Sequence, residues 1–176
     1  MTNRFNWVTR PKALGENTVK GEGIRLTVLT DSLIRIELNK SGVFEDRASQ
    51  TVFYRDFPKT EFKAETINGE ILIETKKLLL KYSGEGKLSV KLKEEPASVW
   101  NLGDDFEDLK GTTETLDATN GEVPLKRGLC SRYGFSVLDD SENLLLDENG
   151  RITPREENTK DIYFFGYGYD YLGCIR

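Results

Sequence analysis

The sequence contains no histidine, and this absence removes several kinds of catalytic site at once. Ser-His-Asp and Cys-His nucleophilic catalysis, histidine-ligated zinc and acid–base catalysis by imidazole all require that side chain. The two cysteines, Cys130 and Cys174, are too few for a disulfide framework or a four-thiolate metal site. We therefore expect reduced, mostly buried thiols, no metal and no cofactor. Carboxylate catalysis, aromatic stacking or no catalysis at all remain open.

Long apolar runs and clusters of basic residues are also missing. Apolar segments such as Leu78-Leu79-Leu80 are too short to cross a bilayer. The 25 Lys and Arg residues are outnumbered by 30 Asp and Glu residues, whereas affinity for nucleic acid depends mainly on neutralising phosphates. The segment from Met1 to Phe5 lacks the apolar region of a secretory signal. The sequence thus predicts a cytoplasmic protein with no membrane partner and no nucleic-acid partner.

Apolar and polar residues alternate with a period of two along most of the chain, which is typical of strands with one buried face. Asn68-Gly69 is a strong hairpin signal, because both residues tolerate positive φ. We expect an antiparallel meander over residues 61–93, ended by Glu94-Glu95-Pro96. The predicted strands lie at residues 24–28, 34–38, 62–66, 70–75, 77–82, 88–93, 134–138, 143–147 and 161–167. Many short strands with close turns predict an all-β, antiparallel β-sandwich.

We expect a single domain over residues 1–176, with an N-terminal strap at about 1–22 and a last strand at about 161–176. Residues 103–125 are rich in Gly, Asp, Thr and Asn and predict a long excursion from the sandwich, a kind of loop that is often functional. Acidic clusters at 104–108 and 139–142 could divide acid and base roles, as paired carboxylates do in glycosidases. We interpret them instead as solvated loop residues, because nothing in the sequence would keep one carboxyl protonated.

One segment resembles a known family. The run from Gly42 to Gln50, GVFEDRASQ, resembles an element of the N-terminal domain of glycoside hydrolase family 31, which contains α-glucosidases and α-xylosidases. Further segments match that domain in the same order, so that the resemblance extends from about residue 20 to the end of the chain. They are Asn101 to Gly103, Thr115 to Asp117, Pro124-Leu125 with Gly128-Leu129, Ser131 to Phe135, Leu138 to Ser141, and Asp161 to Gly168.

The resemblance implies a galactose-mutarotase-like β-sandwich that packs on a catalytic (β/α)8 barrel. In that family the barrel carries an Asp nucleophile and an Asp acid/base, and no carboxylate of this chain matches those positions. The chain is therefore expected to be an accessory domain of a retaining α-glucosidase, acting in carbohydrate metabolism. It would shape the rim of the oligosaccharide site without being catalytic alone. Mutarotase activity is not expected, because that family uses histidine as the acid.

The resemblance also suggests site residues. The candidates for the substrate rim are Asp117, Asn120, Arg132 and Tyr133, although relatives often have Asp or Asn where this chain has Tyr133. The aromatic run near the C-terminus suggests burial inside the sandwich or beneath a partner. The candidates for the barrel interface are Tyr163, Phe165, Tyr167, Tyr169 and Tyr171, and this surface would promote self-association if no barrel covered it.

Two other classes of function remain open at this point. An independent carbohydrate-binding module would use an exposed aromatic such as Trp7, Trp100 or Tyr133 as a stacking platform. A plain structural or assembly module would bind no sugar and would confer no activity on a barrel.

Overall fold

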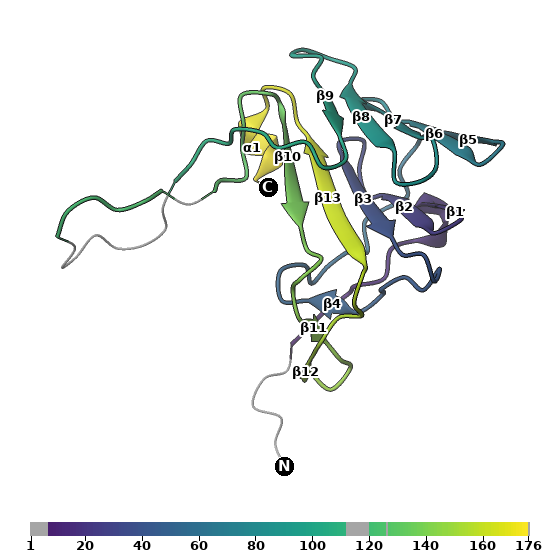
Figure 1. Cartoon of the computed structure of the whole chain (residues 1–176), viewed down its shortest axis with the longest axis horizontal. Helices are drawn as coiled ribbons and strands as arrows, with labels where there is room; N and C mark the ends of the chain where they lie inside the picture. The colour runs from purple at the N-terminus through teal and green to yellow at the C-terminus, as the bar shows by residue number, and fades with distance from the viewer. Residues whose placement is uncertain (1–6, 112–119, 126, 176) are drawn as a thin grey trace.

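The computed structural model describes residues 7–111, 120–125 and 127–175. In these residues the chain forms three antiparallel sheets, which confirms an all-β fold (Figure 1). The first sheet has the order β1 (Thr18–Gly21), β2 (Ile24–Val28), β3 (Leu33–Leu38), β13 (Lys160–Gly166), β10 (Phe135–Asp139). The second sheet is a meander of β5 (Lys63–Ile67), β6 (Glu70–Glu74), β7 (Leu78–Tyr82), β8 (Leu88–Leu92) and β9 (Val99–Asn101).

Three short strands form the third sheet, and two short helices complete the part of the fold that the structure describes. The strands are β12 (Ile152–Thr153), β11 (Leu145–Leu146) and β4 (Ala48–Ser49), in that order. A 3-10 turn, η1 (Gly15–Asn17), precedes β1, and a single helical turn, α1 (Tyr171–Cys174), follows β13. No helix in the described part of the chain is long and apolar enough to cross a membrane.

The first two sheets pack face to face around one hydrophobic core, as a β-sandwich requires. Their inward side chains belong to a single buried cluster, in which Ile24, Ile36 and Phe164 of the first sheet meet Leu80 and Val90 of the second. The Phe164 ring is fully buried, with its centroid 5.5 Å from those of both Trp100 and Phe135. Aromatic side chains from three strands therefore fill the centre of the sandwich.

The predicted strands coincide with observed ones, and the Asn68-Gly69 turn joins β5 to β6 with positive φ at both residues. One expectation about the meander is wrong. Glu94-Glu95-Pro96 does not end it, because a turn closed by Ala97 N donating to Glu94 O returns the chain along β8 as β9. The N-terminal strap is also partly built into the fold, since β1 pairs with β2.

Gly134 lies where the turn before β10 touches the turn that precedes β9. A Cβ atom on Gly134 would lie 2.6 Å from Cδ of Pro96 and 3.0 Å from Cα of Gly168, and the residue has a φ of +74°. Gly69 offers a matched comparison, because its φ is +83° and a Cβ atom there would have no heavy atom within 4 Å.

We expect Gly69→Ala to lower the free energy of unfolding by roughly 1–2 kcal/mol, the cost of the left-handed conformation alone. Gly134→Ala should cost about 1–3 kcal/mol more, because its methyl group also overpacks the contact with Pro96. Urea denaturation of both variants measures the difference. Equal losses for the two variants would contradict the close packing inferred at Gly134.

Candidate functional site

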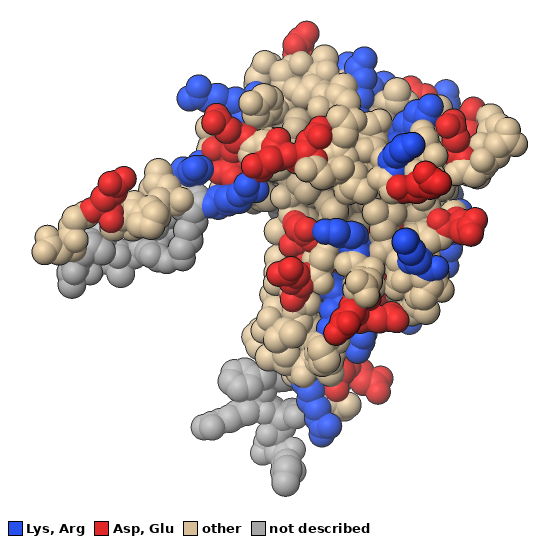
Figure 2. Space-filling model, viewed as in Figure 1, with Lys and Arg blue, Asp and Glu red and all other residues tan. Residues whose placement is uncertain are grey.

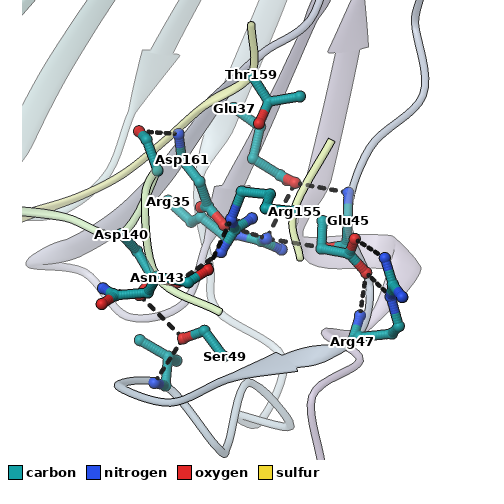
Figure 3. Close-up of polar contacts among 12 residues, drawn as sticks. Arg35, Glu37, Glu45, Arg47, Ser49, Asp140, Asn143, Arg155, Thr159 and Asp161 are labelled. Atoms are coloured by element: carbon teal, nitrogen blue, oxygen red, sulfur yellow. Dashed lines mark hydrogen bonds and ion pairs between the residues drawn. The ribbon is translucent and has the colours of Figure 1, made fainter. Parts of the chain in front are cut away.

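A network of buried ion pairs covers the outer face of the first sheet, opposite the hydrophobic core (Figure 3). At its centre, Arg35 of β3 binds Asp161 of β13 with two hydrogen bonds, from Nε to Oδ1 and from Nη2 to Oδ2, each 2.8 Å long. Both side chains are almost fully buried. The contact joins neighbouring strands whose residues are 126 positions apart in the sequence.

Arg155 extends the network to the third sheet. Its Nη1 donates to Asp161 over 2.9 Å and its Nη2 to Asp140 over 3.0 Å. Asp140 also accepts hydrogen bonds from Ser49 Oγ of β4 and from Asn143 Nδ2. Asp140 has no exposed surface, so the interpretation of residues 139–142 as solvated carboxylates is wrong for this residue.

The family-like segment from Gly42 to Gln50 closes over the same face. Arg25 of β2 forms a bidentate pair with Glu37 of β3 and also donates to Asp46 over 2.7 Å. The carbonyl of Glu45 accepts from both Arg25 and Arg35. This segment therefore holds the outer face of the sheet together, and the described geometry gives it a structural role.

The two central aspartates have pKa values shifted in opposite directions. Burial pushes the pKa of Asp161 upward, but the hydrogen bonds and charge of Arg35 outweigh it and hold the pKa below the ordinary aspartate value. Burial raises the pKa of Asp140, and the hydrogen bonds from Ser49 and Asn143 offset this only in part.

Opposite shifts of this kind are typical of an acid–base pair in an enzyme. Here, however, neither carboxylate is accessible. The cavity beside the network, lined by Glu37, Glu45, Arg155 and Asp161 among others, has a volume of about 30 Å³. That space holds one water molecule and no sugar ring. The network is consequently structural.

A second region lies between β9 and β10, where the described residues 103–111, 120–125 and 127–130 leave the sandwich as an excursion (Figure 1). Its two legs are joined near the base by Arg127 Nη2 to Asp105 Oδ1 over 2.9 Å, Gly128 N to Asp108 Oδ1 over 3.1 Å and Leu109 N to Cys130 O over 2.7 Å. A Cβ atom on Gly128 would collide with the Leu109 carbonyl oxygen, so the close approach of the legs requires glycine there. The base of the excursion is thus a defined structure.

Three carboxylates of the 104–108 cluster, those of Asp104, Asp105 and Asp108, accept hydrogen bonds at this base. Asp104 Oδ2 accepts from the backbone N–H and side-chain amide of Asn101, and Asp105 and Asp108 hold the opposite leg as described. Lys, Arg, Asp and Glu side chains are interspersed over the face that Figure 2 shows, without a large field of one sign. Asp105 is exposed, as expected for a solvated loop residue, whereas the Asp108 side chain is almost fully buried, so that interpretation is wrong for Asp108.

The rim candidates are found on the excursion and at its base. Asn120 lies on the excursion and is exposed, while Arg132 and Tyr133 lie together in the turn that enters β10. The Tyr133 ring is 46% exposed, with its centroid 6.0 Å from that of Phe135. Asp117 lies outside the described residues.

Two of the proposed interface residues are buried within this chain. Tyr163 accepts a hydrogen bond from Arg55 Nε over 2.6 Å, and burial raises its pKa to about 12. The Tyr167 hydroxyl accepts from Ser131 N over 2.5 Å. Neither exposes enough surface for an interface, because Tyr163 lies on the covered interior strand β13 and Tyr167 packs against the turn that enters β10. Trp100, a proposed sugar platform, is likewise buried in the core.

The exposed apolar surface instead lies just beyond β13. Tyr169 is 62% exposed and both Leu172 and Ile175 are 63% exposed, whereas Phe165 and Tyr171 are half-buried. Gly168 N donates to Gly134 O, which brings this segment to Tyr133, and Cys174 Sγ lies 4.0 Å from Leu129 O. We call Leu129, Tyr133, Tyr169, Leu172 and Ile175 the terminal apolar surface. It adjoins the base of the excursion.

No protein-family model matches the chain, and a search of the curated proteins finds no significant match. The described residues contain no group of three or more His, Cys, Asp or Glu side chains that could hold a metal ion. The resemblance to family 31 therefore stays a prediction, and the site must be judged on its geometry.

The buried network generates a prediction about stability. We expect Asp161→Asn to lower the free energy of unfolding at pH 7 by about 3–5 kcal/mol, because it leaves Arg35 buried without its charge partner. Asp140→Asn is the matched control and should cost much less, since burial already penalises the ionised form of that carboxyl.

The loss of stability in Asp161→Asn should also depend on pH. A lowered folded-state pKa contributes stability that is fully present above the unfolded aspartate pKa of about 3.9. This contribution is lost as the pH falls through the lowered pKa of Asp161. The gap between wild type and Asp161→Asn should hence shrink on acidification, as measured by urea denaturation at several pH values. An equal cost for the two variants at pH 7 would contradict the central role of Asp161.

Proposed function

We propose that this chain is the N-terminal accessory β-sandwich of a retaining, α-glucosidase-type glycoside hydrolase of family 31. It packs on the catalytic barrel and shapes the rim of the substrate site, and it is not catalytic alone. The observation that carries this proposal is the position of the terminal apolar surface directly beside the base of the excursion. One docked partner could therefore cover the terminal apolar surface and also contact the excursion.

The terminal apolar surface favours a large partner over solvent. Tyr169, Leu172 and Ile175 lie within seven residues of one another, and each exposes more than half of its surface. Clustered exposed apolar side chains of this kind mark interaction sites in folded proteins. A barrel docked on α1 would bury them.

The excursion is suited to reach across such a partner. Its base is held by the Arg127–Asp105 pair and by the backbone contacts of Leu109 and Gly128. Leu109 at the base and Leu125 beyond it are exposed, and so is the polar Asn120. Apolar residues would pack on the barrel, and polar residues would face the sugar.

The state of the carboxylates favours an accessory role over catalysis by this chain. A retaining glycosidase needs two carboxyl groups about 5–5.5 Å apart on either side of an accessible sugar. Asp140 and Asp161 are buried beneath Arg35 and Arg155, and Asp105 and Asp108 join the legs of the excursion. Each of these four carboxylates is therefore held by a partner within the chain.

The direct test compares the 176-residue chain with a protein extended by the coding sequence that follows Arg176 in its gene. We expect the extension to encode a barrel and the extended protein to hydrolyse p-nitrophenyl α-glucoside, while the chain alone is inert. Hydrolysis by the chain alone would overturn the proposal. An extended protein without a barrel would overturn it equally.

Within the extended protein, Tyr133→Ala should raise KM about 2- to 10-fold with little change in kcat, because the lost aromatic contact binds substrate without taking part in the reaction. Ile67→Ala is the control, since Ile67 is exposed on β5, the edge strand of the second sheet. Asn120, Arg132 and Asp117 are the next positions to replace. An unchanged KM in all four rim variants would contradict a role at the rim.

The exposure of Tyr133 also supports the second candidate, an independent carbohydrate-binding module. Calorimetric titration of the 176-residue chain with maltose distinguishes the two candidates. We expect no saturable binding. Binding by the monomer that Tyr133→Ala abolishes would favour the module.

A further inference from the structure

The two cysteines of the chain lie together where the excursion meets the C-terminal helix. Cys130 is on the returning leg of the excursion, and its carbonyl accepts from Leu109 N over 2.7 Å. Cys174 is the last residue of α1, and its Sγ lies 4.0 Å from the carbonyl oxygen of Leu129, the residue before Cys130. Both cysteines are free and half-buried. Two segments that are distant in the sequence thus bring their only thiols to one place.

The surroundings of the thiols are also defined. The hydroxyl of Tyr167, held by Ser131 N, interacts electrostatically with both thiols. The buried hydroxyl of Ser136 on β10 is also close to Cys174 and acts to lower its pKa.

The thiols influence each other directly. The pKa of Cys174 is raised to about 12, mainly by burial and in part by the adjacent Cys130 side chain. A negative charge on Cys130 therefore helps to retain the proton on Cys174. Conversion of Cys130 to a mixed disulfide removes this influence and makes Cys174 easier to deprotonate.

We propose that Cys130 and Cys174 form an oxidisable pair that closes to an intramolecular disulfide when a small-molecule disulfide is the oxidant. The bond ties the returning leg of the excursion to α1. It fixes the position of α1 relative to the base of the excursion, next to the terminal apolar surface. The pair and its chemistry do not depend on the proposed function.

The reaction proceeds in two exchange steps. The Cys130 thiolate attacks one sulfur of the small disulfide, so that a mixed disulfide forms and one small thiolate leaves. Cys174 then loses its proton to solvent and attacks the Cys130 sulfur, and the second small thiolate leaves. Overall, two protein thiols are oxidised to a disulfide and the small disulfide is reduced to two thiols. Cys130 attacks first, because the raised pKa keeps Cys174 protonated at neutral pH.

The test treats the folded 176-residue chain with one equivalent of 2,2′-dipyridyl disulfide, whose released pyridine-2-thione is measured by absorbance. We expect two thiones per chain and a monomer lighter by the mass of two hydrogen atoms. The Cys174→Ser variant should release one thione and keep one pyridyl group on Cys130. The Cys130→Ser variant should react much more slowly.

Several results would overturn the proposal. They are stable mixed disulfides on both cysteines, a disulfide between two chains, and thiols that react only after denaturation. Thermal unfolding provides a second readout, because a bond between Cys130 and Cys174 restricts the unfolded chain and should raise Tm, an increase that dithiothreitol reverses. An unchanged Tm in the oxidised monomer would contradict closure between segments that separate on unfolding.

Discussion

The Arg35–Asp161 ion pair is the interaction on which the arrangement of this fold depends. It joins β3 to β13, two interior strands of the first sheet that come from opposite ends of the chain. Through Arg155 it also reaches Asp140 and Ser49, and so holds the third sheet against the first. Because a buried charge left without its partner is costly, each member of the network fixes the position of the next. This explains how the outer face of the sheet can be polar and buried at once.

Much of the sandwich could be predicted from the sequence, because apolar and polar residues alternate along many of its strands. Residues 78–92 are the clearest example, since Leu78, Leu80, Leu88 and Val90 are all buried as the pattern predicted. Two-residue strands such as β4 and β12 are too short to have a period, and α1 is a single turn. The helix had one local signal, Asp170, whose side chain caps it by accepting from Gly173 N.

The candidate site was less accessible to sequence reasoning. In the sequence, Asp140 resembles an ordinary turn aspartate, because nothing there shows that Arg155, fifteen residues later, pairs with it. In the sequence, Tyr163 and Tyr167 belong to an aromatic run that would suit either a buried core or an interface. Their burial is evident only in the structure, where other parts of the chain cover both residues. In contrast, Arg132 and Tyr133 do occupy an exposed turn beside the excursion, where the resemblance to family 31 suggested a rim. Local patterns therefore located the exposed turns, while long-range charge pairing decided which polar residues are buried.

The buried network and the terminal apolar surface lie at opposite ends of the sandwich. The network stabilises the strands, whereas the excursion and the terminal apolar surface are exposed and, as we propose, contact a partner. Hydrogen–deuterium exchange compares the 176-residue chain with the protein extended beyond Arg176 and tests this claim most directly. The account predicts new protection in residues 103–111 and 169–175 and none in β5. Unchanged exchange at the excursion and α1, or protection centred on β5, would contradict it.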